Sequence, residues 1–405
     1  MNILPYGRQS IDAADLQAVT ESIQSGWLTT GPKVGEFEEA FAQRVGAKHA
    51  VAVCNATAAL HLAMLVSGIG SGDRVVTSPN TFLASANCAA FVGATPDFCD
   101  IDPVTYNLDP AKLAADWTPD TRGIVAVDYG GQTADMVAIS KIARQHGAIV
   151  IEDACHAVGG EFEHDGQHYK IGGHPWADIT TFSFHPVKTM TCGEGGMFVT
   201  DNDEFAEKAR RLRSHGMVRQ PEMFLGLGDG VNESDNAALN EQGPWYYEMH
   251  DLGFNYRITD FQCALGLNQL RRLDSFLNRR REIVAAYNDA FASINWIQTP
   301  GLRNERDRDL TSWHLYTMMV DFKSLGVTRS SMMKSLRARR VGTQVLYIPV
   351  YLQPWYQSSY GYRAGKCPIA EQQYQQSLSL PLFPEMSDAD VGLVVDSVLQ
   401  FTDTL

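Results

Sequence analysis

A lysine and an aspartate follow two successive apolar runs that are expected to be buried strands. Asp153 ends the first run, and Lys188 comes just past the next one. If the two strands run side by side and parallel, both side chains emerge at one end of a sheet. A lysine amine forms an imine with a carbonyl compound, and an aspartate pairs with a protonated pyridine nitrogen. Pyridoxal phosphate requires both groups, because its protonated ring takes up the electrons left when the substrate loses its α-proton.

The surroundings of Lys188 distinguish it from an isolated surface lysine. A lone lysine on a loop is usually only solvated, but here Ser183 and His185 precede it and Gly193-Glu-Gly-Gly196 follows. We therefore predict that Lys188 holds pyridoxal 5′-phosphate and that Asp153 binds the ring of this cofactor.

A phosphate site is predicted at Cys54-Asn-Ala-Thr-Ala-Ala59, where a strand is expected to end and a helix to begin. Free amides at a helix start bind phosphate, and Thr57 adds a hydroxyl. A plain helix cap by Asn55 or Thr57 is the alternative, and the motif alone does not decide between them. Phe82, at the end of the next run, is placed either to stack on a planar ring or to join the core.

Histidine and cysteine spacing gives no metal site. His164 and His168 are separated by Asp165-Gly166, which predicts a solvent-facing hairpin in place of a helix that would aim both rings at one ion. Four further candidates gather near the expected lysine site: Cys155, His156, His185 and Cys192. Because no pair among them has zinc-ribbon spacing, no metal is expected.

The elements that must position these residues are indicated by short apolar runs alternating with amphipathic stretches between about residues 50 and 200. The expected strands are 50–54, 74–77, 96–100, 123–127, 148–153, 178–184 and 196–200. The expected helices between them include 58–67, 85–91 and 136–146. This alternation predicts an α/β fold with a mostly parallel sheet covered by helices on both faces.

The rest of the chain predicts a second, smaller unit. Residues 217–248, acidic and rich in Gly, Asn and Pro, form either a long surface excursion or a disordered loop. After them, helical spacing is found at 258–270 and 274–292. Strands are expected at 315–321 and 343–348.

Composition excludes several classes of function. The 405 residues are 44% hydrophobic and 20% charged, an ordinary balance for a globular protein of more than one domain. A formal net charge of −14 without a basic run argues against nucleic acid or membrane partners. Seven scattered cysteines, and the lack of a signal sequence or a long apolar run, favour a reduced cytoplasmic protein.

Motifs spread over nearly the whole chain carry a resemblance to a known family. They lie at 25–33, 37–41, 55–60, 81–85, 152–157, 213–216 and 262–266, with Phe182-Ser-Phe-His-Pro-Val-Lys188 and Gly253-Phe-Asn-Tyr-Arg257 as the most specific. With these motifs the chain resembles the DegT/DnrJ/EryC1/StrS sugar aminotransferases, which are fold-type I pyridoxal-phosphate enzymes. The resemblance implies a seven-stranded, mostly parallel sheet in a large domain and a smaller α+β C-terminal domain. The implied boundaries are an arm at 1–15, the large domain at 16–270 with its excursion at 217–248, and the small domain at 271–405.

The same resemblance implies roles for individual residues. Lys188 is similar to the Schiff-base lysine and proton shuttle, Asp153 to the partner of the pyridine nitrogen, and His156 to the neighbour of the ring hydroxyl. Phosphate contacts are implied for Ala56, Thr57 and Ser183, ring stacking for Phe82, and a phosphate contact from a second subunit for Asn255. The implied sugar-nucleotide pocket consists of Tyr6, Trp27, Leu28, Thr29, Val345, Leu346 and Tyr347. Composite sites of this kind imply a homodimer.

Within the family, four segments are most similar to the pseudaminic acid branch, the UDP-4-amino-4,6-dideoxy-N-acetyl-β-L-altrosamine transaminases. These segments are 216–217, 244–248, 342–349 and 379–383. The branch implies glutamate as amino donor and C4 of a UDP-linked 4-keto-6-deoxy N-acetylamino sugar as acceptor. Two positions depart from the family: Asn55-Ala-Thr57 replaces a Ser-Gly-Thr triplet, and Leu346 stands where many relatives have histidine.

Three other functions are compatible with this fold. Another UDP- or dTDP-linked 4-keto-6-deoxysugar fits the same motifs. A related sugar dehydratase would have histidine at the lysine position, which argues for transamination here because Lys188 is present. A non-catalytic sensor or scaffold of the same fold would be expected to have lost Lys188 or Asp153.

Overall fold

A seven-stranded sheet forms the centre of the protein, whose computed structural model describes residues 3–226 and 243–401. Its strands, in spatial order, are β1 (His49–Val53), β9 (Gly196–Thr200), β8 (Ile179–Ser183), β5 (Ile149–Asp153), β4 (Thr121–Val127), β2 (Arg74–Thr77) and β3 (Thr95–Phe98). Only β9 is reversed, pairing antiparallel with both β1 and β8. The mostly parallel α/β sheet predicted from the sequence is confirmed, with strand ends that differ by one or two residues.

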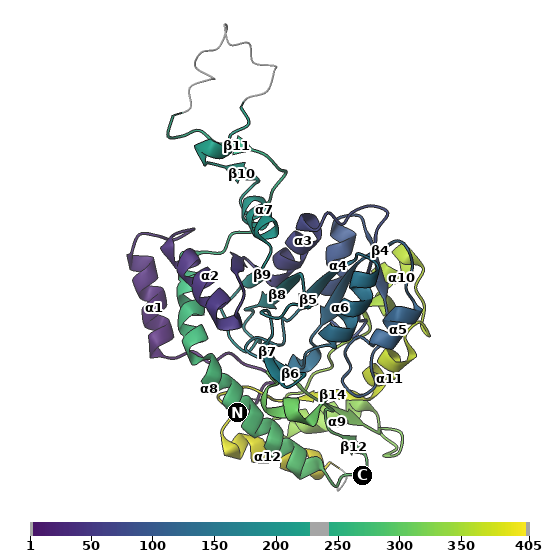
Figure 1. Ribbon diagram of the computed structural model, residues 1–405. Helices are drawn as coiled ribbons and strands as arrows, with labels where there is room; N and C mark the ends of the chain where they lie inside the picture. The colour runs from purple at the N-terminus through teal and green to yellow at the C-terminus, as the bar shows by residue number, and fades with distance from the viewer. Residues whose placement is uncertain (1–2, 227–242, 402–405) are drawn as a thin grey trace.

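Helices cover both faces of this sheet (Figure 1). On one face lie α3 (Ala56–Val66), α4 (Ala84–Phe91) and α7 (Asp203–Arg213), which share a core with Val51, Val125 and Ile151. The opposite face is covered by α2 (Pro32–Val45), α5 (Pro110–Ala115) and α6 (Met136–Gln145). Because successive strand residues point to opposite faces, a sheet covered on both sides must be buried at nearly every position, as most residues of these strands are.

The C-terminal part forms a second core on a three-stranded antiparallel sheet (Figure 1). Its strands are β12 (Ile297–Gln298), β13 (Tyr316–Val320) and β14 (Ser377–Leu380). Its helices are the C-terminal half of α8 (Asp260–Phe291), α9 (Arg329–Ala338) and α12 (Asp388–Leu399). Two further helices of this part of the chain, α10 (Pro354–Tyr360) and α11 (Pro368–Gln376), pack beside the large sheet, in a cluster with Phe98 and Tyr106. The predicted domain boundary at 270/271 falls inside α8, and the division into domains stays a prediction.

Two predictions about this region were wrong. A single 32-residue helix, α8, replaces the two expected at 258–270 and 274–292, because the residues between them include no Gly or Pro to end it. The strand expected at 343–348 is irregular, with one bridge between Gln344 and Ser379. That irregular backbone carries Leu346 and Tyr347 toward the end of the large sheet.

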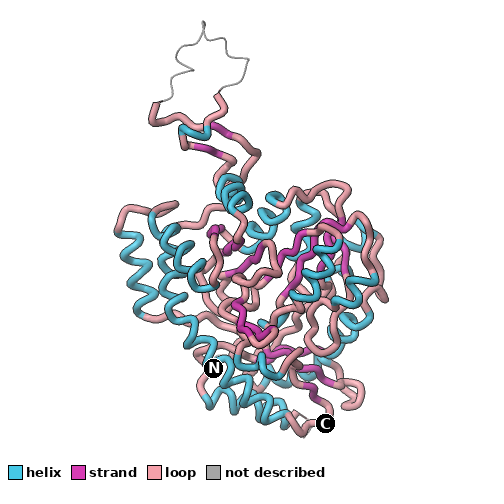
Figure 2. Tube along the Cα trace, viewed as in Figure 1, coloured by secondary structure: helices cyan, strands magenta, loops and turns pink. Residues whose placement is uncertain are grey.

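The remaining helices and strands lie outside the two sheets described above (Figure 2). They are α1 (Ala13–Gln24), the hairpin of β6 (Glu161–His164) and β7 (Gln167–Lys170), the hairpin of β10 (Met217–Val218) and β11 (Glu248–Met249), and the short 3-10 turns η1 (Tyr129–Gly131), η2 (Pro221–Met223), η3 (Glu305–Asp309) and η4 (Val350–Leu352). The hairpin predicted around Asp165-Gly166 is confirmed. Of the predicted excursion, residues 227–242 lie outside the described residues, and its two described ends form the β10–β11 pair. No helix within 3–226 or 243–401 is long and apolar enough to cross a membrane.

Candidate active site

Asp153 lies at the carboxyl end of β5, buried and held from two sides. The Ser85 hydroxyl of α4 donates to Asp153 Oδ2 (2.6 Å), and the backbone N–H of Cys155 donates to Oδ1 (3.2 Å). Ser85 is itself hydrogen-bonded to the Thr81 hydroxyl (2.7 Å). Each carboxylate oxygen therefore has a donor, which fixes the orientation of the Asp153 side chain at the end of the sheet.

Lys188 lies in a closed loop that follows β8. The N–H of Cys192 donates to the carbonyl of Phe184 (2.9 Å), which brings the two ends of the loop together. The N–H of Thr191 donates to the side chain of Gln269 on α8 (3.4 Å), which anchors the loop from behind. The position of the lysine is thus set by backbone hydrogen bonds on both sides of it.

The environment of Lys188 favours an uncharged amine. Burial lowers the pKa of this lysine, and nearby Cys155 and Asp153 oppose that shift only in part. Only the neutral amine attacks a carbonyl carbon, so burial increases the reactive fraction near neutral pH. Lys188 has the chemistry expected of a residue that binds a carbonyl cofactor covalently.

A cup of backbone amides lies at the same edge, at the start of α3. Asn55 caps this helix by accepting from the N–H of Ala58 (2.9 Å), whereas the N–H groups of Ala56 and Thr57 have no hydrogen-bond partner among the described residues. The two interpretations of the motif are therefore compatible: Asn55 caps the helix, and the N–H groups of Ala56 and Thr57 remain available. In the sheet register Ser183 lies opposite Gly196.

Gly196 is pressed against this cup. A Cβ atom there would lie 2.5 Å from Asn55 C and 2.6 Å from Ala56 N. The absence of a side chain at Gly196 thus lets the start of α3 approach the end of β8, so that Ala56, Thr57 and Ser183 come together. Amides at a helix start together with hydroxyl groups are donors suited to a phosphate group.

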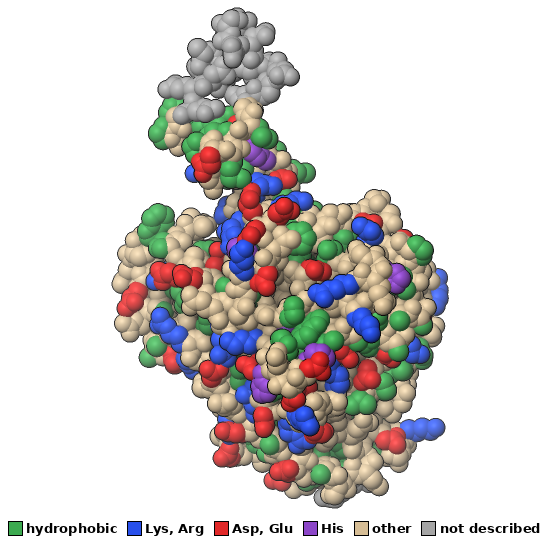
Figure 3. All heavy atoms as spheres, in the orientation of Figure 1, with side chains coloured by type: hydrophobic (Ala, Val, Ile, Leu, Met, Phe, Trp, Pro, Cys, Tyr) green, Lys and Arg blue, Asp and Glu red, His purple; other side chains and the backbone are tan. Residues whose placement is uncertain are grey.

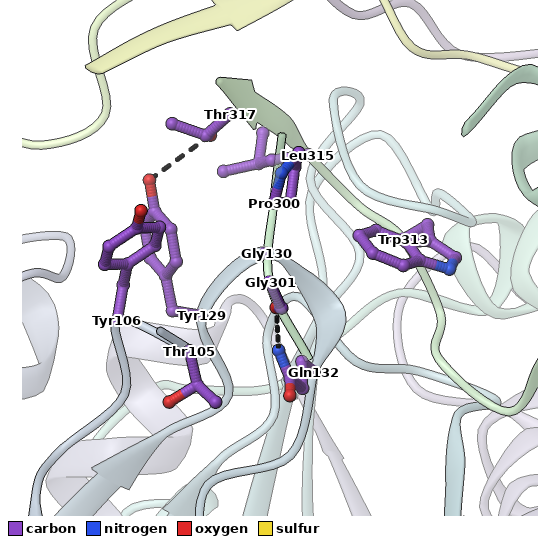
Figure 4. A pocket seen from close by; sticks show the side chains of 10 residues that line it. All are labelled: Thr105, Tyr106, Tyr129, Gly130, Gln132, Pro300, Gly301, Trp313, Leu315 and Thr317. Carbon is purple, nitrogen blue, oxygen red and sulfur yellow. Dashed lines mark hydrogen bonds between the residues drawn. The ribbon is translucent and has the colours of Figure 1, made fainter. Parts of the chain in front are cut away.

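His156 and Tyr347 form a second cluster beside Asp153. Gly130 donates its N–H to His156 Nδ1 (3.3 Å), and His156 Nε2 lies 3.2 Å from the Tyr347 hydroxyl. Tyr129, seen next to Gly130 in Figure 4, donates its hydroxyl hydrogen to the carbonyl of Leu346 and holds that segment in place. Burial, with a smaller contribution from Lys188, keeps the pKa of His156 well below its ordinary value.

Two further aromatic residues border this cluster. The Phe82 ring is 59% exposed and its centroid lies 6.3 Å from that of Tyr347. Tyr6 is half-buried. The pKa of Tyr347 lies well above its ordinary value, first because Tyr347 is buried, then because Tyr129 and Tyr6 are near it. The N-terminal arm reaches this place because Leu4 pairs with Val341.

The sequence matches the DegT/DnrJ/EryC1/StrS aminotransferase family over residues 9–399. The chain belongs to this family. It is 45% identical over 401 residues to the spore coat polysaccharide biosynthesis protein SpsC of Bacillus subtilis, which covers 98% of this chain and 96% of SpsC. The family and the fold together make the chain a pyridoxal-phosphate-dependent sugar aminotransferase.

Solved structures agree with this assignment. Helicobacter pylori PseC, an aminotransferase involved in the biosynthesis of pseudaminic acid, superimposes with a TM-score of 0.87, 28% identity and full coverage of both chains. The sugar aminotransferase Spr1654 of Streptococcus pneumoniae in its pyridoxal-phosphate form gives a TM-score of 0.85 at 26% identity over 99% of each chain. The fold-type I architecture predicted from the sequence is therefore confirmed.

The cofactor of the DegT/DnrJ/EryC1/StrS enzymes fits the side chains found here. A cup that a single Cβ atom would fill suits the phosphate, and the fixed carboxylate of Asp153 suits a pyridinium nitrogen. The amine of Lys188, with its lowered pKa, suits the aldehyde. When bound, the cofactor supplies an electron sink for the carbanion formed at the substrate carbon. In the described residues no group of three or more His, Cys, Asp or Glu could hold a metal ion.

Not all predicted site residues gather at this edge. Trp27, Leu28 and Thr29 are exposed. Within the described residues, no hydrogen bond, ion pair or ring contact joins them to the cofactor cluster, which consists of Ala56, Thr57, Phe82, Asp153, His156, Ser183, Lys188 and Tyr347. Their backbone is fixed by Asp260, whose N–H donates to the Thr29 carbonyl (2.7 Å) and whose carboxylate accepts from the N–H of Gly31 (2.8 Å).

Val345 also lies apart from these residues, and the side chain of Asn255 does not contact them, although the carbonyl of the next residue, Tyr256, accepts from the N–H of Cys54 beside the cup (2.9 Å). Val345 borders a separate cavity of about 410 Å³ against α9. Asn255 is exposed, pairs through its backbone with Ser214 near the base of the β10–β11 hairpin, and makes no side-chain hydrogen bond in the described part of the chain. Its side chain is free for a group outside this subunit.

Several residues of the site carried no assigned role in the sequence. Ser85 lies in one of the family motifs, but nothing in its spacing indicates a bond to Asp153. Tyr129 and Gly130 follow β4 directly, and a search of all strand ends would have found them. In the sequence Gly196 was only a turn signal, because the close approach of its backbone to that of Asn55 and Ala56 cannot be predicted before the sheet order is known.

Proposed function

We propose that this enzyme transfers the amino group of glutamate to C4 of a UDP-linked 4-keto-6-deoxy N-acetylamino sugar, in nucleotide-sugar biosynthesis of the pseudaminic acid type. The observation that carries the proposal is the likeness to PseC over the whole length of both chains. It is supported by Tyr6 of the N-terminal arm and by Leu346 and Tyr347 of the C-terminal part, which lie beside His156 and Tyr129. A diphosphate nucleoside held away from the reacting carbon provides binding energy that can orient C4.

The side chains of the cluster have distinct proposed roles. Lys188 binds the cofactor covalently and moves the proton between donor, cofactor and acceptor, while Asp153 keeps the ring nitrogen protonated. Ala56, Thr57 and Ser183 hold the phosphate, Phe82 covers the ring face, and His156 borders the ring hydroxyl. These roles are supported by the burial of Lys188 and by the two donors on Asp153.

A homodimer with composite sites is part of the proposal. The β10–β11 hairpin stands off the body of the subunit (Figure 1), and hydrophobic side chains gather on it (Figure 3). Exposed apolar side chains there are Leu225, Trp245, Tyr247, Met249 and Leu252. An apolar arm that contacts little of its own subunit is suited to cover a second copy, and the free side chain of Asn255 lies at its base. Trp27 and Leu28, also exposed, are further candidates for burial in the dimer.

A second substrate is favoured by a specific observation. The identity to SpsC is 45%, against 28% to PseC, and SpsC belongs to spore coat polysaccharide biosynthesis. Leu346 also lacks the imidazole that many relatives have at this position. The second candidate is therefore amination of another UDP- or dTDP-linked 4-keto-6-deoxysugar destined for a polysaccharide.

The test is a competition among acceptors with glutamate as donor. Purified enzyme is incubated with UDP- and dTDP-4-keto-6-deoxysugars, with and without the N-acetylamino group, and products are detected by mass. The proposal expects the highest kcat/KM for the UDP-linked N-acetylated sugar. A preference for a dTDP-sugar would select the second candidate. If the free sugar, or a simple α-keto acid, reacted as fast as any nucleotide sugar, both substrate proposals would fail.

A further inference from the structure

His314 is a second imidazole packed against His156. The two ring centroids are 4.5 Å apart at an interplanar angle of 45°. His314 is 5% exposed, and its Nδ1 has no hydrogen-bond partner within the described residues. It therefore lies directly behind the residue proposed to border the cofactor ring.

The backbone around His314 is clamped to the end of β4. Leu315 and Ser312 donate their N–H groups to the carbonyls of Gly130 and Gly131, both at 3.2 Å. A Cβ atom at Gly131 would lie 2.7 Å from the nitrogen of Trp313 and 2.9 Å from that of His314. Trp313, which Figure 4 shows together with Gly130, has a φ of 49°, a conformation that costs a non-glycine residue about 1 kcal/mol or more. Something must hold this strained turn in place.

Arg280 of α8 provides that hold. Its guanidinium donates to the carbonyls of Leu382 (3.0 Å), His314 (3.2 Å) and Trp313 (3.3 Å). Arg280 is 1% exposed and forms no ion pair in the described part of the chain, and its Nε has no partner. Burying a charge without a counter-ion costs stability. What the protein gains from Arg280 is the three charge-assisted hydrogen bonds to carbonyls, which hold the turn at Trp313 and His314.

We propose that Arg280 is a positioning residue of the active site, which acts through His314 to fix the ring and the donor nitrogen of His156. The N–H of Gly130 points at His156 Nδ1, so that nitrogen carries no proton. A neutral His156 then carries its proton on Nε2, toward Tyr347. The inference rests on the proposed place of His156 beside the cofactor ring.

The charges around the pair favour the same state. The groups that face the two imidazoles are Arg280 from α8, Lys188 and His185 from the loop after β8, and the phenols of Tyr129 and Tyr347. Burial is the main reason why the pKa of His314 lies well below its ordinary value, and the cations add to it. If Arg280 lost its charge and its three hydrogen bonds, protonation of His314 would become easier and the turn behind His156 would no longer be held.

The test uses the apoprotein, so the cofactor and the sugar do not enter it. Protein with ¹⁵N-labelled histidine is titrated by NMR, with His156→Asn and His314→Asn used to assign the two imidazoles. Arg280→Met removes charge and donors, whereas Arg280→Lys keeps the charge. Arg281→Met is the matched control, because Arg281 lies on the same helix and donates to Thr311 and Leu310 but does not reach His314.

In the wild-type and Arg281→Met proteins, His156 is expected to remain neutral and protonated on Nε2 through the neutral range. In Arg280→Met, the midpoint of His314 should rise by about one pH unit or more. If Arg280→Met folds and its His314 titrates with the same midpoint as in the wild type, the proposal is overturned. If Arg280→Met does not fold, the variants Arg280→Lys and His314→Asn provide the test. In each of them His156 should populate both neutral tautomers. If His156 kept the single Nε2–H tautomer in both variants, the proposal would be overturned.

Discussion

At the scale of single residues, the site depends on how Asp153 and Lys188 are held. Two neutral donors hold Asp153, so its carboxylate stays fixed without an ion pair that would compete for it. Lys188, in contrast, has no hydrogen-bond partner for its amine within the described residues, and burial disfavours its charge. The carboxylate of Asp153 is therefore fixed in orientation, whereas the amine of Lys188 is unpaired, which agrees with the roles proposed for the two residues.

Lys188→Ala should bind pyridoxal phosphate only non-covalently and lose turnover. The lost proton transfer alone is expected to cost about 10²- to 10⁴-fold, because Lys188 is the proposed proton shuttle. Borohydride reduction followed by mass measurement shows whether the cofactor is attached. Lys48→Ala, which removes an exposed lysine paired with Asp203, is the control and should be labelled like the wild type. Full labelling of Lys188→Ala would disprove the assignment.

The pH dependence of cofactor attachment tests the environment of Lys188. The neutral amine reacts, and burial lowers its pKa, so the rate of attachment to apoprotein should rise with pH and level off below the ordinary lysine value of 10.5. The charge of Asp153 opposes the shift, so in Asp153→Asn the plateau should move to still lower pH. Stopped-flow absorbance at a series of pH values measures this. A plateau that moves upward in Asp153→Asn would contradict it.

Asp153→Asn should also separate binding from turnover. The change is nearly isosteric, so the fold is expected to survive, but an amide cannot keep the pyridine nitrogen protonated. Single-turnover rates with glutamate should fall by about 100-fold or more, the scale of a lost acid-base interaction. Near-normal rates would show that Asp153 does not have this role.

Residue types and order in the sequence were sufficient to predict that Lys188 and Asp153 lie near each other at one edge of the sheet, because strand ends of a parallel sheet meet there. They did not predict Ser85 or His314. Their contacts join segments far apart in the chain, Ser85 to Asp153 and His314 to His156, and no local pattern reports such pairs. The family motifs indicated where Leu346 and Tyr347 would lie, although the strand predicted there was wrong.

At the scale of elements, the approach of α3 to β9 forms the cup of backbone amides that is proposed to hold the phosphate. The cup requires that β9 begin with a glycine, since the helix start lies directly against it. The sequence predicted both elements almost to the residue, whereas their contact followed only from β9 being reversed between β1 and β8.

Gly196→Ala should weaken cofactor binding. The added methyl group would push Asn55 and Ala56 away from β9, at a cost of about 1 to 3 kcal/mol. The Kd for pyridoxal phosphate should rise by about tenfold or more, as measured by fluorescence titration of the apoprotein. Gly392→Ala, in α12 with open space around it, is the control and should leave the Kd unchanged. Equal Kd values for the two variants would show that the cup tolerates a side chain.

At the scale of the whole molecule, the proposed dimer would combine parts of two chains in each site. The apolar β10–β11 hairpin stands away from the sheet of its own subunit (Figure 1). Asn255 lies at the base of this hairpin, next to Tyr256, whose carbonyl accepts from the N–H of Cys54, and its exposed side chain contacts no other described residue through a hydrogen bond. A second chain is the proposed occupant of that surface.

Mixing two inactive variants tests this arrangement. If Lys188→Ala and Asn255→Ala are each inactive, a heterodimer should contain one site with neither lesion. At equal mixing about half of the dimers are heterodimers by random exchange, so about a quarter of the wild-type activity per site is expected. Subunit exchange is followed by native mass spectrometry of differently tagged chains. Complete exchange without recovered activity would argue for self-contained sites.

The helix α8 has a consequence for how this chain can change in length. Asp260 fixes the segment before α2, Gln269 anchors the lysine loop, and Arg280 holds the turn at His314. All three lie on one uninterrupted helix, in which each residue turns the following side chain by about 100°. A single insertion or deletion between Asp260 and Arg280 would therefore aim at least one of them away from its partner. Relatives that keep these contacts should tolerate substitutions in this stretch but keep its length unchanged.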